Sequence, residues 1–383
     1  MNGFSTHGFT EAQLLMRDSV QELLRRHLAP ERIRALDEAG EFPHAAYDAL
    51  AKAGWMGLPY PEADGGMGGS AKDLAVFLEA VSEIHASMAS GYLTTVIYAG
   101  KHIQLSGSAE LRRRYLPAIV AGKIKMAFAL TEPHTGSDAA SIATRAVRTN
   151  DGWRVSGQKL YITCAHVADY LVTAVRTGPE AGRRGLSMML IDAKAKGVTI
   201  RPVDTLGRRT TKPNEIFFDD VHVPADHILG EENKGWRGLM RGLNIERLCI
   251  AACAAGNMRH AIDYARDYAR ERKAFGKPIT EYQAIAHKFA DMQMMAETAR
   301  LHVYRVAEMI DAGLDPVLET SAAKVIATEN DFKVCDLGLQ IMGGAGYTKA
   351  HDMERLFRDS RIGPIGGGTN EIQRNVIAKL MGL

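Results

Sequence analysis

The stretch WRVSGQKLYIT, Trp153 to Thr163, decides the fold class because its apolar residues recur at a spacing close to two. Four further segments after Lys125 share this short spacing and are bounded by Gly, Pro and Asp, which is typical of strands. They are DYLVTAV (169–175), LSMMLID (186–192), VTIRPV (198–203) and NEIFFDDVHVP (214–224). The pattern predicts a small β domain over residues 125–232.

Both flanks of this region have a helical period instead. Apolar residues three and four apart recur before it in EAQLLMRDSVQELLRRHL, AAYDALAKAGW, KDLAVFLEAVSEIH and AELRRRYLPAIVAG. The same period returns after it in three long stretches, Gly238 to Arg272, Tyr282 to Ala312 and Pro316 to Ile341. We therefore expect an α+β fold that is mainly α, with helical domains at residues 1–124 and 233–383 on either side of the β domain.

Length and charge restrict the class of protein. A chain of 383 residues is too long for one compact core. Its 47 basic and 45 acidic residues give a net charge of +2, a weak basis for binding nucleic acid or an anionic membrane. No apolar run approaches the ~18 residues of a membrane span, so no stable membrane association is expected. The start MNGFSTHGFTEAQ and the end KLMGL carry no targeting pattern, and the four scattered cysteines favour a reducing compartment, so we expect a cytoplasmic location.

The common catalytic motifs of nucleotide-binding enzymes, zinc proteases and serine hydrolases are absent from the sequence. The chemistry must come from six other segments, which follow one another in a definite order. They are AFALTEPHTGSDAASIATRA, GQKLYIT, NIERLCIAACAAG, ARERKAFGKPITEYQ, QIMGGAGYTKAHDMERLFRDSRI and IGGGTNEIQ.

Each segment taken alone has both a functional and a structural interpretation. Thr131 to Asp138 offers hydroxyls and free amides that suit a phosphate or a polar ring edge, but taken alone it is better explained as a β-turn between strands. Arg272 lies at the end of a long helix, where it either binds an anion or is itself the cation that offsets the helix dipole. Gly343 and Gly344 indicate a helix stop or a close backbone approach to a ligand. Glu246, in an apolar helical stretch, is a surface carboxylate or a group held in a pocket for proton transfer.

Together, in this order and at these spacings, the six segments resemble the acyl-CoA dehydrogenase family over essentially the whole chain. The resemblance implies an N-terminal helical domain, a small β-barrel-like middle domain and a C-terminal four-helix bundle. It also implies one FAD per subunit, usually in a homotetramer. No metal site is expected, because Cys249 and Cys253, which would share one helix face, have no nearby His or further Cys. The family converts an acyl-CoA thioester into the trans-2-enoyl-CoA and passes the electrons to an electron-transfer flavoprotein.

The resemblance assigns residues to three sites. One subunit's flavin is implied to contact Phe128, Leu130, Thr131, Gly136, Ser137, Tyr161, Ile162, Thr163, Thr369 and Glu371. A neighbouring subunit's flavin is implied to contact Arg272, Phe275, Gln283, Gln340, Gly343 and Gly344. The acyl-CoA is implied to contact Ser137, Asn244, Arg247 and Gly368.

The catalytic base of the resemblance is displaced in this chain. Many family members have Tyr-Glu-Gly-Thr where this sequence has Gly366 to Thr369, and that Glu is their base. Here Gly367 takes its place. A subset that includes the isovaleryl-CoA and long-chain enzymes carries the base in a Glu-Arg-Leu segment on the first long helix of the C-terminal domain, which matches Glu246 to Leu248. We therefore expect Glu246 to be the base and the Gly367 N–H to bind the thioester oxygen.

The sequence also bears on the substrate and on other reactions. Gly366 replaces a common Tyr, so the loss of two side chains at 366 and 367 leaves room for a branched, cyclic or bulky acyl group. Ser87 to Lys101 has no Arg like that of the glutaryl-type enzymes, so a free dicarboxylate tail is less favoured. Two alternatives stay open: a diverged acyl-CoA oxidase, enoyl-CoA reductase or flavin monooxygenase, and a non-catalytic CoA-binding or assembly protein if Glu246 is only a surface carboxylate.

Overall fold

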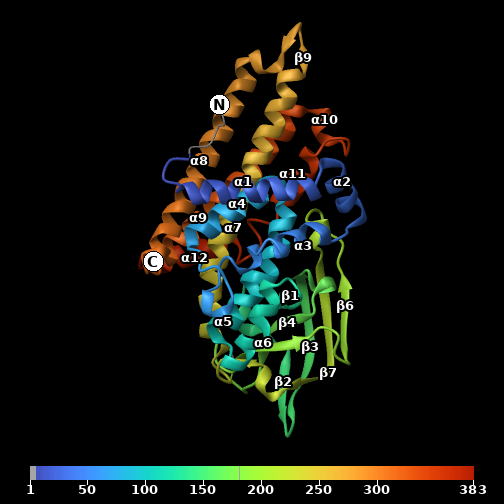
Figure 1. The fold of residues 1–383 in the computed structure, drawn as a ribbon, viewed down its shortest axis with the longest axis vertical. Coiled ribbons are helices and arrows are strands. Elements are labelled where there is room, and N and C mark those ends of the chain that lie inside the picture. Colours follow the sequence, from blue (N-terminus) through green and yellow to red (C-terminus); the bar gives the residue numbers. More distant parts are fainter. Residues whose placement is uncertain (1–5, 181) are drawn as a thin grey trace.

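The computed structural model describes residues 6–180 and 182–383, and it has the helical, β, helical order expected from the sequence. The β domain occupies one end of an elongated molecule, and the long C-terminal helices extend to the other end (Figure 1). The first N-terminal helices lie across the middle of the molecule, and the last two lie beside the β domain. The expected fold class is therefore confirmed.

The N-terminal helices are started by capping side chains. The side chains of Thr10 and Ser70 each accept a hydrogen bond from the backbone N–H of the third residue of the following helix. The side chain of that third residue accepts one from the backbone N–H of Thr10 or Ser70, so both helix starts form a capping box. The α4 helix has non-helical backbone angles at His85 (φ −158°, ψ 104°) and continues into a π-helical segment, Leu93–Ala99. The helices are α1 (Glu11–His27), α2 (Pro30–Ala39), α3 (His44–Lys52), α4 (Ala71–Tyr92), α5 (Gly100–Ser106) and α6 (Ala109–Val120).

The middle domain is one sheet with strand order β6-β7-β3-β2-β4-β5-β8, and β1 pairs with β4 in parallel. Its strands are β1 (Met126–Ala129), β2 (Arg145–Thr149), β3 (Gly152–Thr163), β4 (Tyr170–Arg176), β5 (Leu186–Asp192), β6 (Val198–Pro202), β7 (Pro213–Pro224) and β8 (Ile228–Leu229). The spacing of apolar residues located β3 to β7 within about two residues. It missed β1, β2 and β8, because β1 and β8 are very short and β2 has one buried side chain, Ala146, and so no alternation.

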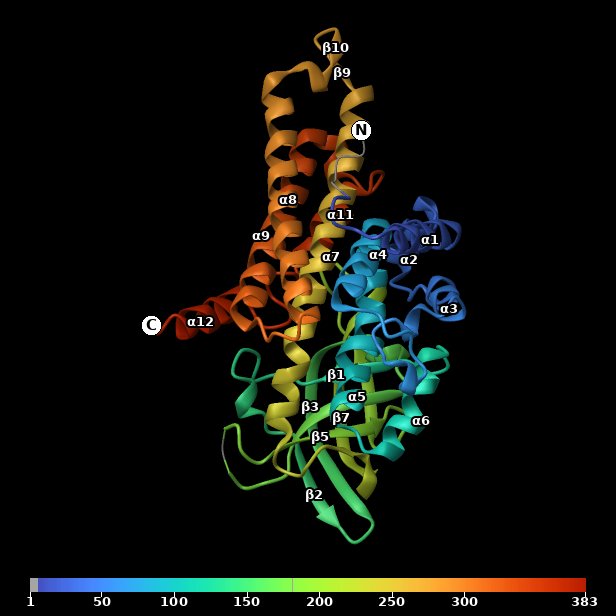
Figure 2. The same ribbon diagram turned by 60° about the vertical axis from the view of Figure 1, so that its left-hand side comes forward.

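The C-terminal domain is built on three long helices, α7 (Gly235–Glu271), α8 (Gln283–Asp311) and α9 (Val317–Met342). The α7 helix runs from the β domain to the opposite tip of the molecule (Figure 2). The shorter helices α10 (Gly344–Tyr347), α11 (Met353–Ser360) and α12 (Asn370–Leu380) follow α9, which all three contact.

The chain turns back on itself at the tip directly beyond α7. Residues 273–278 form a two-stranded hairpin, β9 (Lys273–Ala274) with β10 (Lys277–Pro278). Its turn residues Phe275 and Gly276 both have positive φ, 50° and 86°, as a two-residue hairpin turn requires. The sequence pattern missed this hairpin because two-residue strands have no measurable period.

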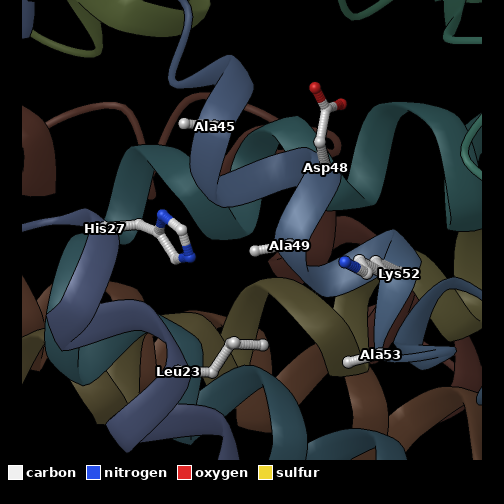
Figure 3. Close-up of a pocket in the computed structure, with 7 residues that line it drawn as sticks. All are labelled: Leu23, His27, Ala45, Asp48, Ala49, Lys52 and Ala53. Atoms are coloured by element: carbon white, nitrogen blue, oxygen red, sulfur yellow. The ribbon is translucent and has the colours of Figure 1, made fainter.

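Helices α4 and α7 form the contact between the two helical domains, and their facing side chains belong to one continuous core. Within the described residues, no helix has both the length and the apolar composition needed to cross a bilayer. All four cysteines are buried and unbridged. A surface groove of ≈ 480 Å³ lies between α1 and α3 and is lined by Leu23, His27, Ala45, Asp48, Ala49, Lys52 and Ala53 (Figure 3). None of these residues belongs to the sites expected from the sequence.

Candidate active site

The glycine loop of residues 365–369 lies directly beside α7. Gly367 has a φ of 65°, and an ideal Cβ built on it would lie 3.4 Å from Glu246 Oε1 and 2.4 Å from Ile250 Cδ1. Ile250 thus fills the space into which a side chain at position 367 would extend, and the Glu246 carboxylate of α7 lies directly beside it. Two segments far apart in the sequence meet at this point.

Buried side chains of α9 and α12 hold the loop in place. Lys324 Nζ donates hydrogen bonds to Gly368 O (3.0 Å) and Asn370 Oδ1 (2.8 Å). Gln373 Nε2 donates to Gly367 O and Gly368 O, both at 3.2 Å. With these carbonyls bound, the Gly367 N–H donates to no acceptor among the described residues. It is therefore available to a ligand. No sequence pattern pointed to Lys324 or Gln373, because neither lies in a recognisable motif for loop support.

The environment of Glu246 suits proton transfer. Its side chain is only 8% exposed, which rules out the alternative that it is a surface carboxylate. Burial raises the pKa of Glu246 to about 7, and the charges of Arg247 and Lys324 oppose that rise. Burial likewise lowers the pKa of Lys324 to about 8. A carboxyl group with a pKa near the working pH is well matched to general-base chemistry.

Arg247 follows the carboxylate on α7 and is also buried, at 7% exposure. Its Nη1 donates to Asn244 Oδ1 (3.2 Å), and Asn244 Nδ2 donates to Asp315 Oδ1 (3.1 Å). The Arg247 Nε has no acceptor among the described residues. The arrangement orders both side chains, and the charge of Arg247 acts on Lys324, which binds the glycine loop. The expected contact of Asn244 and Arg247 with the acyl-CoA stays a prediction.

A buried ion pair fixes the loop of residues 131–138 against strand β3. Lys159 Nζ lies 2.8 Å from Glu132 Oε1 and also donates to Leu130 O (3.0 Å). The Glu132 carboxylate accepts two more hydrogen bonds, from the N–H groups of Ala143 (2.6 Å) and Thr144 (3.0 Å). This pair brings together two of the three segments that the resemblance assigned to the flavin. The sequence analysis did not single out Glu132 or Lys159, although both lie inside the quoted segments.

The surface that this pair creates fits an aromatic group with a polar edge. Gly136 and Ser137 are exposed, and their N–H groups have no acceptor among the described residues. Thr135 Oγ1 is buried without a partner in the same part of the chain. On β3, Tyr161 is 60% exposed and has a φ of 60° at an irregularity in the pairing with β7. A bound ring with carbonyl and amide groups would satisfy these free donors.

The other residues expected at this flavin lie on β1, β3 and α12, and their contact with it stays a prediction. Ile162 is buried at 2% exposure, and Thr163 is half-buried beside it at the end of β3. Phe128 stacks on His102 of α5, with ring centroids 4.9 Å apart. Thr369 caps α12 by accepting from Ile372 N (3.3 Å). Glu371 is exposed on the first turn of that helix.

The residues expected at a neighbouring subunit's flavin lie elsewhere. Arg272, Phe275 and Gln283 are exposed at the β9–β10 end, opposite the β domain (Figure 2). Phe275 is 96% exposed. Gln340, Gly343 and Gly344 are exposed where α9 ends and α10 begins. Within one chain, the structure does not bring these residues to the loop of residues 131–138. Their role at a second subunit's cofactor stays a prediction.

Known proteins match this chain over nearly its whole length. Models of the acyl-CoA dehydrogenase N-terminal, middle and C-terminal domains match residues 10–123, 127–221 and 233–382. The caffeyl-CoA reductase-Etf complex subunit CarC of Acetobacterium woodii is 36% identical over 97% of this chain and 99% of its own. An acyl-CoA dehydrogenase of Bacillus subtilis is also 36% identical, over 97% and 98%. The solved structure of butyryl-CoA dehydrogenase from Megasphaera elsdenii superposes with a TM-score of 0.94 at 30% identity, covering 99% of this chain and 100% of that one.

Proposed function

Because the chain belongs to the acyl-CoA dehydrogenase family, whose members are FAD-dependent oxidoreductases, we propose that it interconverts an acyl-CoA and its trans-2-enoyl-CoA with Glu246 as the base. One observation carries this proposal. The Glu246 carboxylate lies beside Gly367, the loop position at which many family members carry their base. A carboxylate supplied by α7 therefore stands next to the loop that lacks its own.

The residues of this chain divide the reaction between them. Glu246, with its pKa of about 7, accepts the proton from Cα of the acyl group. The free Gly367 N–H donates to the thioester oxygen, where negative charge develops as that proton leaves. Lys324 and Gln373 keep that N–H in place through the loop carbonyls. FAD, when bound at residues 131–137 and Tyr161, supplies the acceptor for the hydride from Cβ.

The electron partner is proposed to be an electron-transfer flavoprotein. The support is that the Acetobacterium relative is named as a subunit of a complex with such a protein. That relative is also named a reductase, which favours the reverse reaction as a second candidate. In that direction Glu246 would return its proton to Cα, so the same residues serve both.

The acyl group is proposed to be branched or cyclic near Cα and Cβ. An ideal Cβ on Gly366 would meet only Ile362 atoms, at 3.6 and 4.0 Å, so the space beside this loop is open. We further propose a homotetramer, because the expected second half of the flavin site lies at the distant tip near Phe275. A cytoplasmic location is proposed from the sequence pattern alone.

Anaerobic flavin reduction by a panel of straight, branched and cyclic acyl-CoAs tests the proposal. The protein is loaded with FAD and the loss of flavin absorbance is followed after mixing. We expect rapid reduction by at least one branched or cyclic member, followed by faster reoxidation with electron-transfer flavoprotein than with air. If no acyl-CoA reduces the flavin and no enoyl-CoA oxidises the reduced enzyme, the proposed reaction is wrong.

A further inference from the structure

Tyr98 lies on the irregular stretch of helix that joins α4 to α5. The π-helical segment Leu93–Ala99 contains it and continues directly into α5. Both parts of this stretch contact α7. π-helical turns are rare in proteins and occur frequently at functional sites. No sequence motif singled out this tyrosine, so its role must be argued from its position.

Two close contacts show how α5 is aligned with α7. An ideal Cβ built on Gly242 of α7 would lie 2.5 Å from His102 Nε2. An ideal Cβ built on Gly238 would lie 3.0 Å from Ser106 Oγ. Because four residues forward on α5 correspond to four residues back on α7, the two helices run antiparallel and stay in register over this turn. His102 also stacks on Phe128 of β1, one of the residues expected at the flavin.

The same alignment brings Tyr98 to the catalytic base. Tyr98 lies four residues before His102. Glu246 lies four residues after Gly242, so the next turn of each helix places Tyr98 and Glu246 opposite one another. The electrostatics agree with this placement. Burial raises the pKa of Tyr98 well above its ordinary value, and Glu246 is the first of the charged groups that add to the rise.

Glu246 therefore lies between the glycine loop and Tyr98. On the loop side, an ideal Cβ on Gly367 would lie 3.4 Å from Glu246 Oε1, and the Gly367 N–H is free. In the proposed reaction that N–H binds the thioester oxygen and Glu246 contacts Cα. The rest of the acyl group points away from its own carbonyl, and hence away from the loop. Its carbons beyond Cβ then approach Tyr98.

The Tyr98 hydroxyl has no partner within the protein. The side chain is half-buried, and its hydroxyl forms no hydrogen bond with any residue that the structure describes. Two buried tyrosines of the same core differ in this respect. Tyr60 donates to Val96 O, and Tyr92 donates to Trp55 O (3.1 Å). A hydroxyl that is left unpaired beside the base is available to a group on the substrate.

We propose that the Tyr98 hydroxyl hydrogen-bonds a neutral oxygen substituent beyond Cβ, a hydroxyl or a carbonyl, so that the substrate is an oxygenated acyl-CoA. This inference rests on the proposed function. A charged substituent is disfavoured here, because a carboxylate would be repelled by Glu246 and a cation would lower the basicity of Glu246. A plain hydrocarbon chain is disfavoured as well, because it would displace water and leave the Tyr98 hydroxyl unpaired.

The test compares acyl-CoAs that differ only in one oxygen. Cyclohexane-1-carbonyl-CoA is compared with its 3-hydroxy, 4-hydroxy and 4-oxo derivatives, and hexanoyl-CoA with 6-hydroxyhexanoyl-CoA. We expect kcat/KM for flavin reduction to be at least ~5-fold higher for the best oxygenated member than for its parent. Tyr98→Phe should lower kcat/KM for that member by at least ~5-fold, mainly through KM, and should leave the parent unchanged or improve it.

Tyr47→Phe is the matched control. Tyr47 of α3 also has a hydroxyl without a described partner, but it is fully buried in the N-terminal core. This variant should keep the wild-type preference. FAD content and Tm of both variants show that folding is intact.

Three results would overturn the proposal: a wild-type enzyme that prefers every hydrocarbon parent, a Tyr98→Phe variant that keeps the preference, or equal losses on both members of a pair. If no acyl-CoA reduces the flavin, the proposed reaction fails. Calorimetric dissociation constants of the same pairs, measured with the FAD-loaded wild type and Tyr98→Phe, then still decide whether Tyr98 binds the oxygen.

Discussion

Two glutamates, Glu132 and Glu246, are both buried, but their pKa values are shifted in opposite directions. Glu132 is surrounded by donors, with Lys159 and two backbone N–H groups within 3.0 Å of its carboxylate. Burial alone would raise its pKa, but the Lys159 charge and these hydrogen bonds outweigh it, and the pKa is lowered. Glu246 receives no hydrogen bond from the described residues, and burial raises its pKa to about 7. The hydrogen-bonded carboxylate of Glu132 stabilises the fold, whereas the carboxylate of Glu246, which receives no hydrogen bond from the described residues, stays available to accept a proton.

A third buried carboxylate, that of Glu83, shows that the pKa shift alone does not separate the base from a structural group. Burial and the nearby Glu79 raise the pKa of Glu83 to about 7 as well. Its carboxylate, however, accepts from Gln21 Nε2 (2.8 Å) at the contact between α1 and α4. A raised pKa therefore does not identify the base by itself. The position of Glu246 beside Gly367 does.

The largest expected effect separates Glu246 from Glu83. Glu246→Gln keeps the shape but cannot accept a proton, so the flavin reduction rate should fall by ~10²- to 10⁴-fold. Glu83→Gln removes a carboxyl of similar pKa and should leave the rate within about twofold, because it contacts neither loop of the site. Stopped-flow reduction at equal FAD content measures both. A near-normal rate in Glu246→Gln would mean that the proton goes to another group.

The next largest effect is on stability, and it concerns Glu132, the hydrogen-bonded carboxylate. Lys159→Met leaves Glu132 as an unpaired buried charge, which should lower the free energy of unfolding by about 3–5 kcal/mol and weaken FAD retention. The double variant with Glu132→Gln should be milder, because no charge remains buried. Urea unfolding of the three proteins at one pH gives the comparison. A double variant as unstable as Lys159→Met would show that packing, not charge, is responsible.

The two glutamates should also give opposite pH dependences of stability. The folded-state pKa of Glu246 is raised from 4.5 to about 7, so its ionisation lowers stability as pH rises through that window, by roughly 3 kcal/mol in total. Glu246→Gln should therefore stabilise the protein more at pH 8 than at pH 5. The lowered pKa of Glu132 contributes stability above its ordinary pKa that is lost in acid, so Glu132→Gln should destabilise most at neutral pH. Chemical denaturation at both pH values measures the free energy of unfolding of each variant. If it changed with pH in the same direction in both variants, the proposed difference between Glu132 and Glu246 would be wrong.

The smallest effect compares adjacent glycines. Gly367→Ala puts a Cβ at a φ of 65° and 2.4 Å from Ile250 Cδ1, which should cost about 1–2 kcal/mol of stability. Gly366→Ala meets nothing closer than 3.6 Å and should cost under ~0.5 kcal/mol. Thermal unfolding of both variants measures the difference. Ile250→Val should recover part of the Gly367→Ala loss, and no recovery would mean that backbone strain alone is responsible.

The sequence predicted those parts of the molecule whose signals are local. The long helices and the five longer strands have a clear period, and the six segments carried the family resemblance. The contacts that tie the site together could not be predicted, because they join residues far apart in the chain. Lys324 binds a carbonyl 44 positions away, and Arg208 reaches Ser90 across a domain boundary. An arginine in a loop has no pattern that indicates which helix it will contact.

The split origin of the site has a consequence for how this protein can change. The carboxylate comes from α7 and the free N–H from the glycine loop, so a single substitution rarely affects both. Position 366 can vary in size while Glu246 and its burial stay the same, because its Cβ direction is open. Selection for new acyl groups can therefore act on this loop without first losing turnover. A small library of substitutions at residue 366 alone would vary the acyl groups that the enzyme accepts, while Glu246 and the Gly367 N–H stay the same.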